Sequence, residues 1–114
     1  MNGSPLDLLQ GTVQTLVLKA LSWGPMHGFA ISRFIRDRSH GALGLEDAGL
    51  YQALHRLERR GLVTSAWGQS ENNRRARFYR LTPAGRRALQ DEIATWRRYA
   101  QAVFRVVEAR SAEA

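Results

Sequence analysis

The stretch that most constrains how this chain can fold is Leu50–Val63, where an amphipathic helical pattern runs directly into a strand pattern. Leu50, Leu54 and Leu57 recur at helical spacing and define one apolar stripe. Polar and basic residues lie off that stripe: Gln52, Arg56, Arg59 and Arg60. Gly61 follows, and because glycine takes the left-handed conformation that ends many helices without a steric penalty, we expect the helix to stop at Arg60. The stretch therefore predicts a helix that packs through one face and presents a basic face to its surroundings.

Two further helices are predicted upstream of this stretch. The first is indicated by apolar residues at helical spacing, and Gly24 and Pro25 end its pattern: Leu6, Leu9, Val13, Leu16, Val17, Ala20 and Leu21. The second opens at His27, has Ile31 on its buried side and ends near Ser39, and the glycine-containing segment 39–45 is the predicted turn. A role for His27 as a metal ligand or a base would need a second ligand or a nucleophile nearby. The sequence offers none, so we expect this histidine to cap or pack against its helix.

Two strand patterns follow the basic helix. Val63–Trp67 is rich in β-branched and aromatic residues, and Ala76–Leu81 places Tyr79 and Leu81 on one face and Phe78 on the other. The loop between them, GQSENNRR, ends in two arginines, and a third lies in the second strand: Arg74, Arg75 and Arg77. A hairpin after a helix-turn-helix is typical of a winged helix-turn-helix domain. An arginine-tipped wing can place guanidinium groups on phosphates or in a minor groove, and the alternative is a hairpin tip that is merely solvated.

The last predicted helix starts at Thr82 and Pro83, because threonine caps free N–H groups and proline suits the first helical position. Its apolar residues follow a heptad pattern: Leu89, Ile93, Trp96, Ala100, Val103 and Val107. Such a seam needs a partner, and the candidates are the same helix, the first helix, or both, from a second copy of the chain. We therefore expect a homodimer whose interface adds Leu9 and Val13 of the first helix to these residues. The alternative is that the seam packs on its own domain.

The predicted fold is mainly α with a small β-hairpin. A winged helix-turn-helix domain is expected over residues 1–82 and a C-terminal dimerisation helix over residues 83–110, and the 114 residues together form one compact domain.

Several classes of protein are disfavoured by what the sequence lacks. It has no cysteine, which excludes disulfides and zinc fingers and fits a reducing cytoplasm. No apolar run approaches the roughly 18 residues of a membrane span and no signal peptide is apparent, so a cytoplasmic location is expected. We find no glycine-rich phosphate loop, metal-ligand cluster or nucleophile–base spacing. The sequence therefore predicts no catalytic residue, metal site or cofactor, and the protein is not expected to be an enzyme.

The net charge of +7 makes double-stranded DNA the first partner to consider, although sixteen arginines against the single Lys19 also reflect codon bias. Candidate DNA-binding residues lie on the basic helix and the wing: Gly49, Tyr51, Gln52, His55, Arg56, Arg59, Arg74, Arg75 and Arg77. Gln52 can bond an adenine edge bidentately, and Arg56 can reach a guanine or a phosphate. Tyr51 and His55 either donate to phosphates or are half-buried structural residues. Because a symmetric dimer presents two such helices, the expected operator is an inverted repeat.

Three segments, in this order and spacing, carry a resemblance to a known family: LSWGPMHGFAI, LYQALHRLERRGL and SENNRRARFYRLTPAGRRAL. The chain resembles the PadR family of bacterial transcriptional regulators over roughly Leu9 to Val107. Gln52 stands where relatives usually have proline, and Ala48 and Gly49 stand where a glycine and a hydroxyl residue are usual.

The resemblance has three implications beyond the spacing. It implies that the activity is repression, and that the chain is similar to the smaller subfamily, which has a single short C-terminal helix. It also implies release from DNA by a small aromatic or phenolic effector that binds near Trp96, with Tyr99 beside it, although Trp96 could instead simply fill the core. The rival function is a winged-helix protein-interaction module that does not bind DNA.

Overall fold

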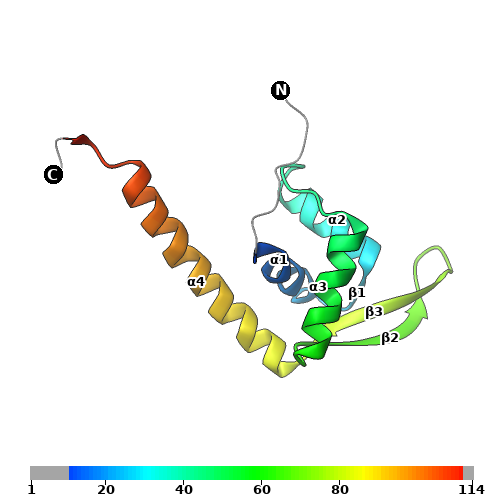
Figure 1. Ribbon diagram of the computed structural model, residues 1–114. Coiled ribbons are helices and arrows are strands. Elements are labelled where there is room, and N and C mark those ends of the chain that lie inside the picture. Colours follow the sequence, from blue (N-terminus) through cyan, green and yellow to red (C-terminus); the bar gives the residue numbers. More distant parts are fainter. Residues whose placement is uncertain (1–10, 112–114) are drawn as a thin grey trace.

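The structure, a computed structural model, describes residues 11–111 (Figure 1). Within these residues the elements follow one another in this order: α1 (Thr12–Leu21), β1 (Met26–His27), α2 (Gly28–Arg38), α3 (Asp47–Arg59), β2 (Val63–Gln69), β3 (Arg75–Leu81) and α4 (Pro83–Val107). The first three helices and the base of the sheet form one body, from which the β2–β3 wing and α4 project in different directions (Figure 1). The predicted winged helix-turn-helix fold, with a long helix at its C-terminal end, is confirmed.

The core forms where the predicted apolar stripes of α1, α2 and α3 meet. Its fully buried side chains come from all three helices and from the first residue of β2: Val17, Leu18, Leu21, Ile31, Leu50, Leu54, Leu57 and Val63. The stripe predicted for the basic helix is thus confirmed as its packing face. α1 begins at Thr12 because Gly11 has a left-handed φ of 90°, whereas we expected helix from Leu6 onward. Leu6 and Leu9 lie outside the described residues.

Local capping fixes the ends of α2 and α3. The Nδ1 atom of His27 accepts a hydrogen bond of 3.2 Å from the backbone N–H of Ala30, so the predicted capping role of this histidine is confirmed. α3 ends at Arg59, with Arg60 as its C-cap residue and Gly61 at a φ of 74°. The predicted helix stop is therefore correct to within one residue.

The sheet has three antiparallel strands in the order β1-β3-β2, which corrects the predicted two-stranded hairpin. Met26 and His27 pair with Tyr79 and Phe78 of β3, so His27, predicted to open the helix, ends an edge strand and caps α2, which begins at Gly28. Leu81 lies opposite Val63 and both are buried, whereas further out Arg77 lies opposite Trp67. Because directly opposed residues share a face, the face that is core at the base of the hairpin carries arginine and tryptophan toward its tip.

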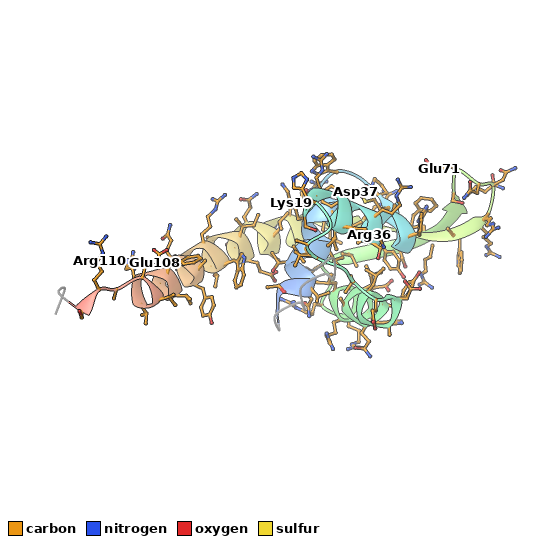
Figure 2. The ribbon with its side chains drawn as sticks, turned by 90° about the horizontal axis from the view of Figure 1, so that it is seen from above. Lys19, Arg36, Asp37, Glu71, Glu108 and Arg110 are labelled. Carbon is orange, nitrogen blue, oxygen red and sulfur yellow. The ribbon has the colours of Figure 1, made fainter. Side chains whose placement is uncertain are left out.

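α4 is joined to the body only through its first half. Thr82 caps it by accepting a 3.0 Å hydrogen bond from the N–H of Gly85, as predicted, and Pro83 is its first residue. Thr15 of α1 donates a 2.6 Å hydrogen bond to Glu92, which fastens α1 to α4. Beyond Tyr99 the helix lies beside no other described element (Figure 1). Glu108 and Arg110 lie at the opposite end of the molecule from Glu71 at the wing tip (Figure 2).

The heptad seam therefore packs on its own domain only in the first half of α4, and the alternative that all of it does so is wrong. None of the described helices is both long and apolar enough to cross a membrane.

Candidate nucleic-acid interface

The face of α3 opposite its buried stripe is exposed and mostly basic. It carries four of the predicted DNA-binding side chains: Gln52, His55, Arg56 and Arg59. They stand on a rigid support, because the residues between them, Ala53, Leu54 and Leu57, are at most 1% exposed in the core. Gly49, in the first turn, is half-buried beside the side chain of Leu45. A helix held this firmly presents its polar face without paying to order the backbone on binding.

Tyr51 lies on the flank of α3 and bridges to the start of α2. Its hydroxyl oxygen is 2.6 Å from the position that a Cβ atom on Gly28 would occupy, so a larger residue there would displace the tyrosine ring. The ring remains exposed on its other side. Tyr51 thus has a packing role between two helices and also a free edge at the interface.

The wing arginines differ in their surroundings. Arg77 donates from Nε to Ser65 Oγ at 2.9 Å, and its Nη2 lies 3.8 Å from Oε2 of Glu58. Ser65 in turn donates to the same Glu58 oxygen at 2.8 Å. This network links β2 and β3 to the last turn of α3. Arg74 and Arg75 are exposed nearer the tip.

A broad groove of about 1330 Å³ separates the start of α2 from the outer wing. Predicted residues line it, among them Tyr51, Arg74, Arg75 and Arg77, together with three that the sequence did not single out: Phe29, Arg33 and Trp67. The guanidinium of Arg33 lies 5.7 Å from the centre of the exposed Phe29 ring. The groove thus combines cations with aromatic faces, a composition suited to a sugar–phosphate chain. No local pattern links these three residues, which come from α2 and β2, and only the fold brings them together.

Tyr79 lies under this surface, on the core face of β3. Burial raises the pKa of its phenol above the usual 10.0, while nearby Arg77 lowers it and Glu58 raises it. The side chain is therefore a neutral structural residue at ordinary pH.

A second groove, of about 600 Å³, lies between α1 and α4. Trp96 and Tyr99, predicted to be neighbours, stack with their ring centres 5.6 Å apart and their planes at 14°. Asp91 and Glu92 also line the groove, opposite Thr12 and other residues of α1. Trp96 does not fill the chain's own core, because it remains 42% exposed. The sequence predicted the aromatic pair but not the carboxylates beside it.

The predicted dimer residues fall into two groups. Leu89 is only 4% exposed because it packs in the chain's own core, so it is removed from the expected dimer face. Val13 and Ile93 are partly buried against the same core. The others leave apolar surface uncovered on α4: Trp96, Ala100, Val103 and Val107, joined by Phe104 and Val106. Leu9 lies outside the described residues.

A helix-turn-helix with an exposed basic recognition face, flanked by an arginine-bearing wing, defines the class of winged helix-turn-helix DNA-binding proteins. The comparisons with known proteins narrow this class. The profile of the transcriptional regulator PadR-like family matches residues 17–91, and the chain belongs to this family. It is accordingly a DNA-binding transcription regulator and not an enzyme.

Solved structures of similar regulators have the same fold. A transcriptional regulator from Clostridium thermocellum is 28% identical, with a TM-score of 0.77 over 86% of this chain and 95% of that chain. A PadR family transcriptional regulator from Eggerthella lenta is 30% identical, with a TM-score of 0.75 over 89% of this chain and 86% of that chain. An uncharacterized 37.1 kDa protein in transposon TN4556 of Streptomyces fradiae is 43% identical over 91 residues, 80% of this chain but 25% of that protein.

Proposed function

We propose that this chain is a repressor that binds an inverted-repeat operator as a homodimer. The observation that carries the proposal is the uncovered apolar face on the distal half of α4. Each chain also has a single recognition helix, α3. Monomers rarely leave such a stripe in water, and pairing two copies through it buries the stripe. Two recognition helices related by a twofold axis then fit adjacent major grooves, about one turn of DNA apart. Repression is what the family resemblance implies.

In this proposal the interface divides between reading bases and gripping the backbone. Gln52 bonds an adenine edge, and Arg56 reaches a guanine or a phosphate. Phosphate contacts come from both elements: Gly49, Tyr51, His55 and Arg59 of α3, and Arg74 and Arg75 of the wing. Arg77 contributes charge but acts mainly through Ser65 and Glu58, because its guanidinium is already engaged by them.

Binding of a labelled duplex at several salt concentrations tests this division. The duplex is first selected from random sequences. The wild-type log–log slope should be steep, because each phosphate contact releases condensed counterions. Arg74→Ala should weaken all duplexes alike and reduce the slope, whereas Gln52→Ala should cost about 1 to 3 kcal/mol on the selected site only. A flat slope would refute the phosphate contacts, and an equal loss on random duplexes would refute base reading by Gln52.

We further propose that the groove between α1 and α4 binds a small aromatic effector that releases the protein from DNA. The stacked Trp96 and Tyr99 rings offer a flat apolar surface for a planar molecule, and stacking is worth about 0.5 to 1.5 kcal/mol per aromatic pair. Asp91 and Glu92 favour a cationic ring over a phenolic acid.

Fluorescence of Trp96 tests the effector, with Trp23 and Trp67 replaced by phenylalanine. A planar cationic dye should quench it saturably, and the selected duplex should weaken dye binding by the factor by which the dye weakens duplex binding. Quenching that leaves duplex affinity unchanged would refute an effector at this groove.

A further inference from the structure

Trp67 is a large apolar side chain without a packing reason for its place in the wing. It is 58% exposed on β2, beyond the point where the hairpin leaves the core, and it lines the groove between the wing and α2. Its cross-strand partner is Arg77, and Gln69, two residues further out, lies opposite Arg75. Arg75 is therefore its diagonal neighbour on the same face, within reach of a long side chain.

The indole lies against two arginines that differ in their other partners. The guanidinium carbon of Arg75 is 4.5 Å from the centre of the Trp67 rings, and that of Arg77 is 5.8 Å away. Arg77 is also held by Ser65 and Glu58. Within residues 11–111, the side chain of Arg75 has neither a carboxylate nor a hydrogen-bond partner, so the contact with Trp67 is the one that fixes its guanidinium.

We propose that Trp67 is a positioning residue for DNA binding, and that its indole holds the Arg75 guanidinium over the groove, ready to meet a backbone phosphate. The inference rests on the placement of the wing on DNA proposed above. Stacking uses the face of the guanidinium, whereas its N–H donors point outward in its plane, so a stacked arginine can still bind a phosphate through two donors. Holding it in place beforehand also reduces the side-chain entropy lost on binding.

The chain contains a matched pair away from this groove. Trp23 is 59% exposed, and the guanidinium carbon of Arg38 lies 4.4 Å from its ring centre. Trp23 also packs edge-on against Phe34, and neither Trp23 nor Arg38 lines the groove. The same chemistry at this second place provides a control for effects of removing an exposed tryptophan.

A double-mutant cycle on a labelled mixed-sequence duplex, long enough to hold two half-sites, tests the proposal. Trp67→Leu should raise the Kd about two- to fivefold for each wing that contacts DNA, which is the range for an exposed cation–π contact. In an Arg75→Met background it should cost nothing further, because the residue it positions is gone. Combined with Arg74→Met the effects should add, since Arg74 contacts no aromatic ring among the residues that the structure describes. Trp67→Phe should restore part of the affinity, and Trp23→Leu should leave it unchanged.

A spectroscopic signature separates positioning from a general effect on the fold. In the free protein the side-chain protons of Arg75 should show ring-current shifts, measurable by NMR, that Trp67→Leu abolishes. The circular dichroism spectrum should stay that of the wild type, because substitutions at exposed positions rarely disturb stability.

Two results would overturn the proposal with the wing placement intact: a loss for Trp67→Leu that is as large in the Arg75→Met background, or no loss for Trp67→Leu while Arg75→Met weakens binding. No effect of Arg75→Met on the duplex would overturn both the positioning role and the proposed wing contact.

Discussion

Replacing Val103 with glutamate is the most direct test of the proposed dimer. Val103 lies on the uncovered face of α4 between Trp96 and Val107, and 39% of it is exposed in the single chain. Fully burying a valine is worth about 1.5 to 3 kcal/mol, so covering the exposed part contributes roughly 0.6 to 1.2 kcal/mol per copy. A carboxylate at the same place must lose much of its hydration, which costs several kcal/mol unless it is paired. Two copies double both effects, so Val103→Glu should raise the dimer Kd by about a thousandfold or more.

Sedimentation velocity over a range of protein concentrations measures this change. The matched control is Gln101→Glu, which changes the charge by the same amount on an exposed part of the same helix but off the apolar seam. Gln101→Glu should sediment as the wild-type dimer, and Val103→Glu as a monomer. The monomer should keep its helical circular dichroism, because Val103 makes no contribution to the buried core. Its affinity for a two-half-site duplex should fall, since two half-sites would no longer be bound by one particle.

A monomeric wild-type chain at micromolar concentration would refute the dimer outright. An equal dimer Kd for Val103→Glu and the wild type would show instead that the copies associate through another surface.

Two further predictions concern stability. Gly85→Ala should lower the free energy of unfolding, measured in urea, by about 1 to 3 kcal/mol, because the new Cβ would collide with the carbonyl of Leu62. Gly49→Ala meets only ordinary contacts and should raise it by up to about 1 kcal/mol. Equal effects of the two substitutions would contradict the close packing of Gly85 at the start of α4. Because the folded pKa of Tyr79 is raised above 10.0, its contribution to stability is complete below pH 10 and is lost as the pH rises through the folded value. Tyr79→Phe should therefore flatten the alkaline part of the stability curve, and an unchanged curve would show that another group titrates.

Much of the fold is predictable because its signals are local. Helical spacing of leucines, the Thr82–Pro83 start and the glycine at 61 each act within one or two turns of chain, and all three operate as expected. β1 was missed because a strand of two residues carries no alternation, and its existence depends on pairing with β3 some fifty positions away in sequence. The start of α1 after Gly11 was missed because the apolar pattern of the sequence continues through this glycine.

The candidate interface shows the same boundary between local and distant information. The exposed face of α3 followed from periodicity alone. The different surroundings of Arg75 and Arg77 could not be predicted in this way, because they depend on the register of β2 against β3 and on the contact between Ser65 and Glu58 of α3. Likewise, the heptad pattern identified an apolar face on α4 but could not show that Leu89 belongs to the chain's own core.

The position of α1 gives the proposed effector a route to the recognition helix. Thr15 donates a hydrogen bond to Glu92 of α4, and the preceding residue, Gln14, accepts a 2.8 Å hydrogen bond from Nη1 of Arg60, at the end of α3. A ligand between α1 and α4 would therefore contact a helix that is hydrogen-bonded both to α4 and to the end of α3. Its effect on DNA is limited by its preference for one spacing of the two recognition helices, because equal binding to both arrangements shifts nothing. Tight binding in this groove is thus insufficient for release, which requires that the ligand's best fit move α1 against α4.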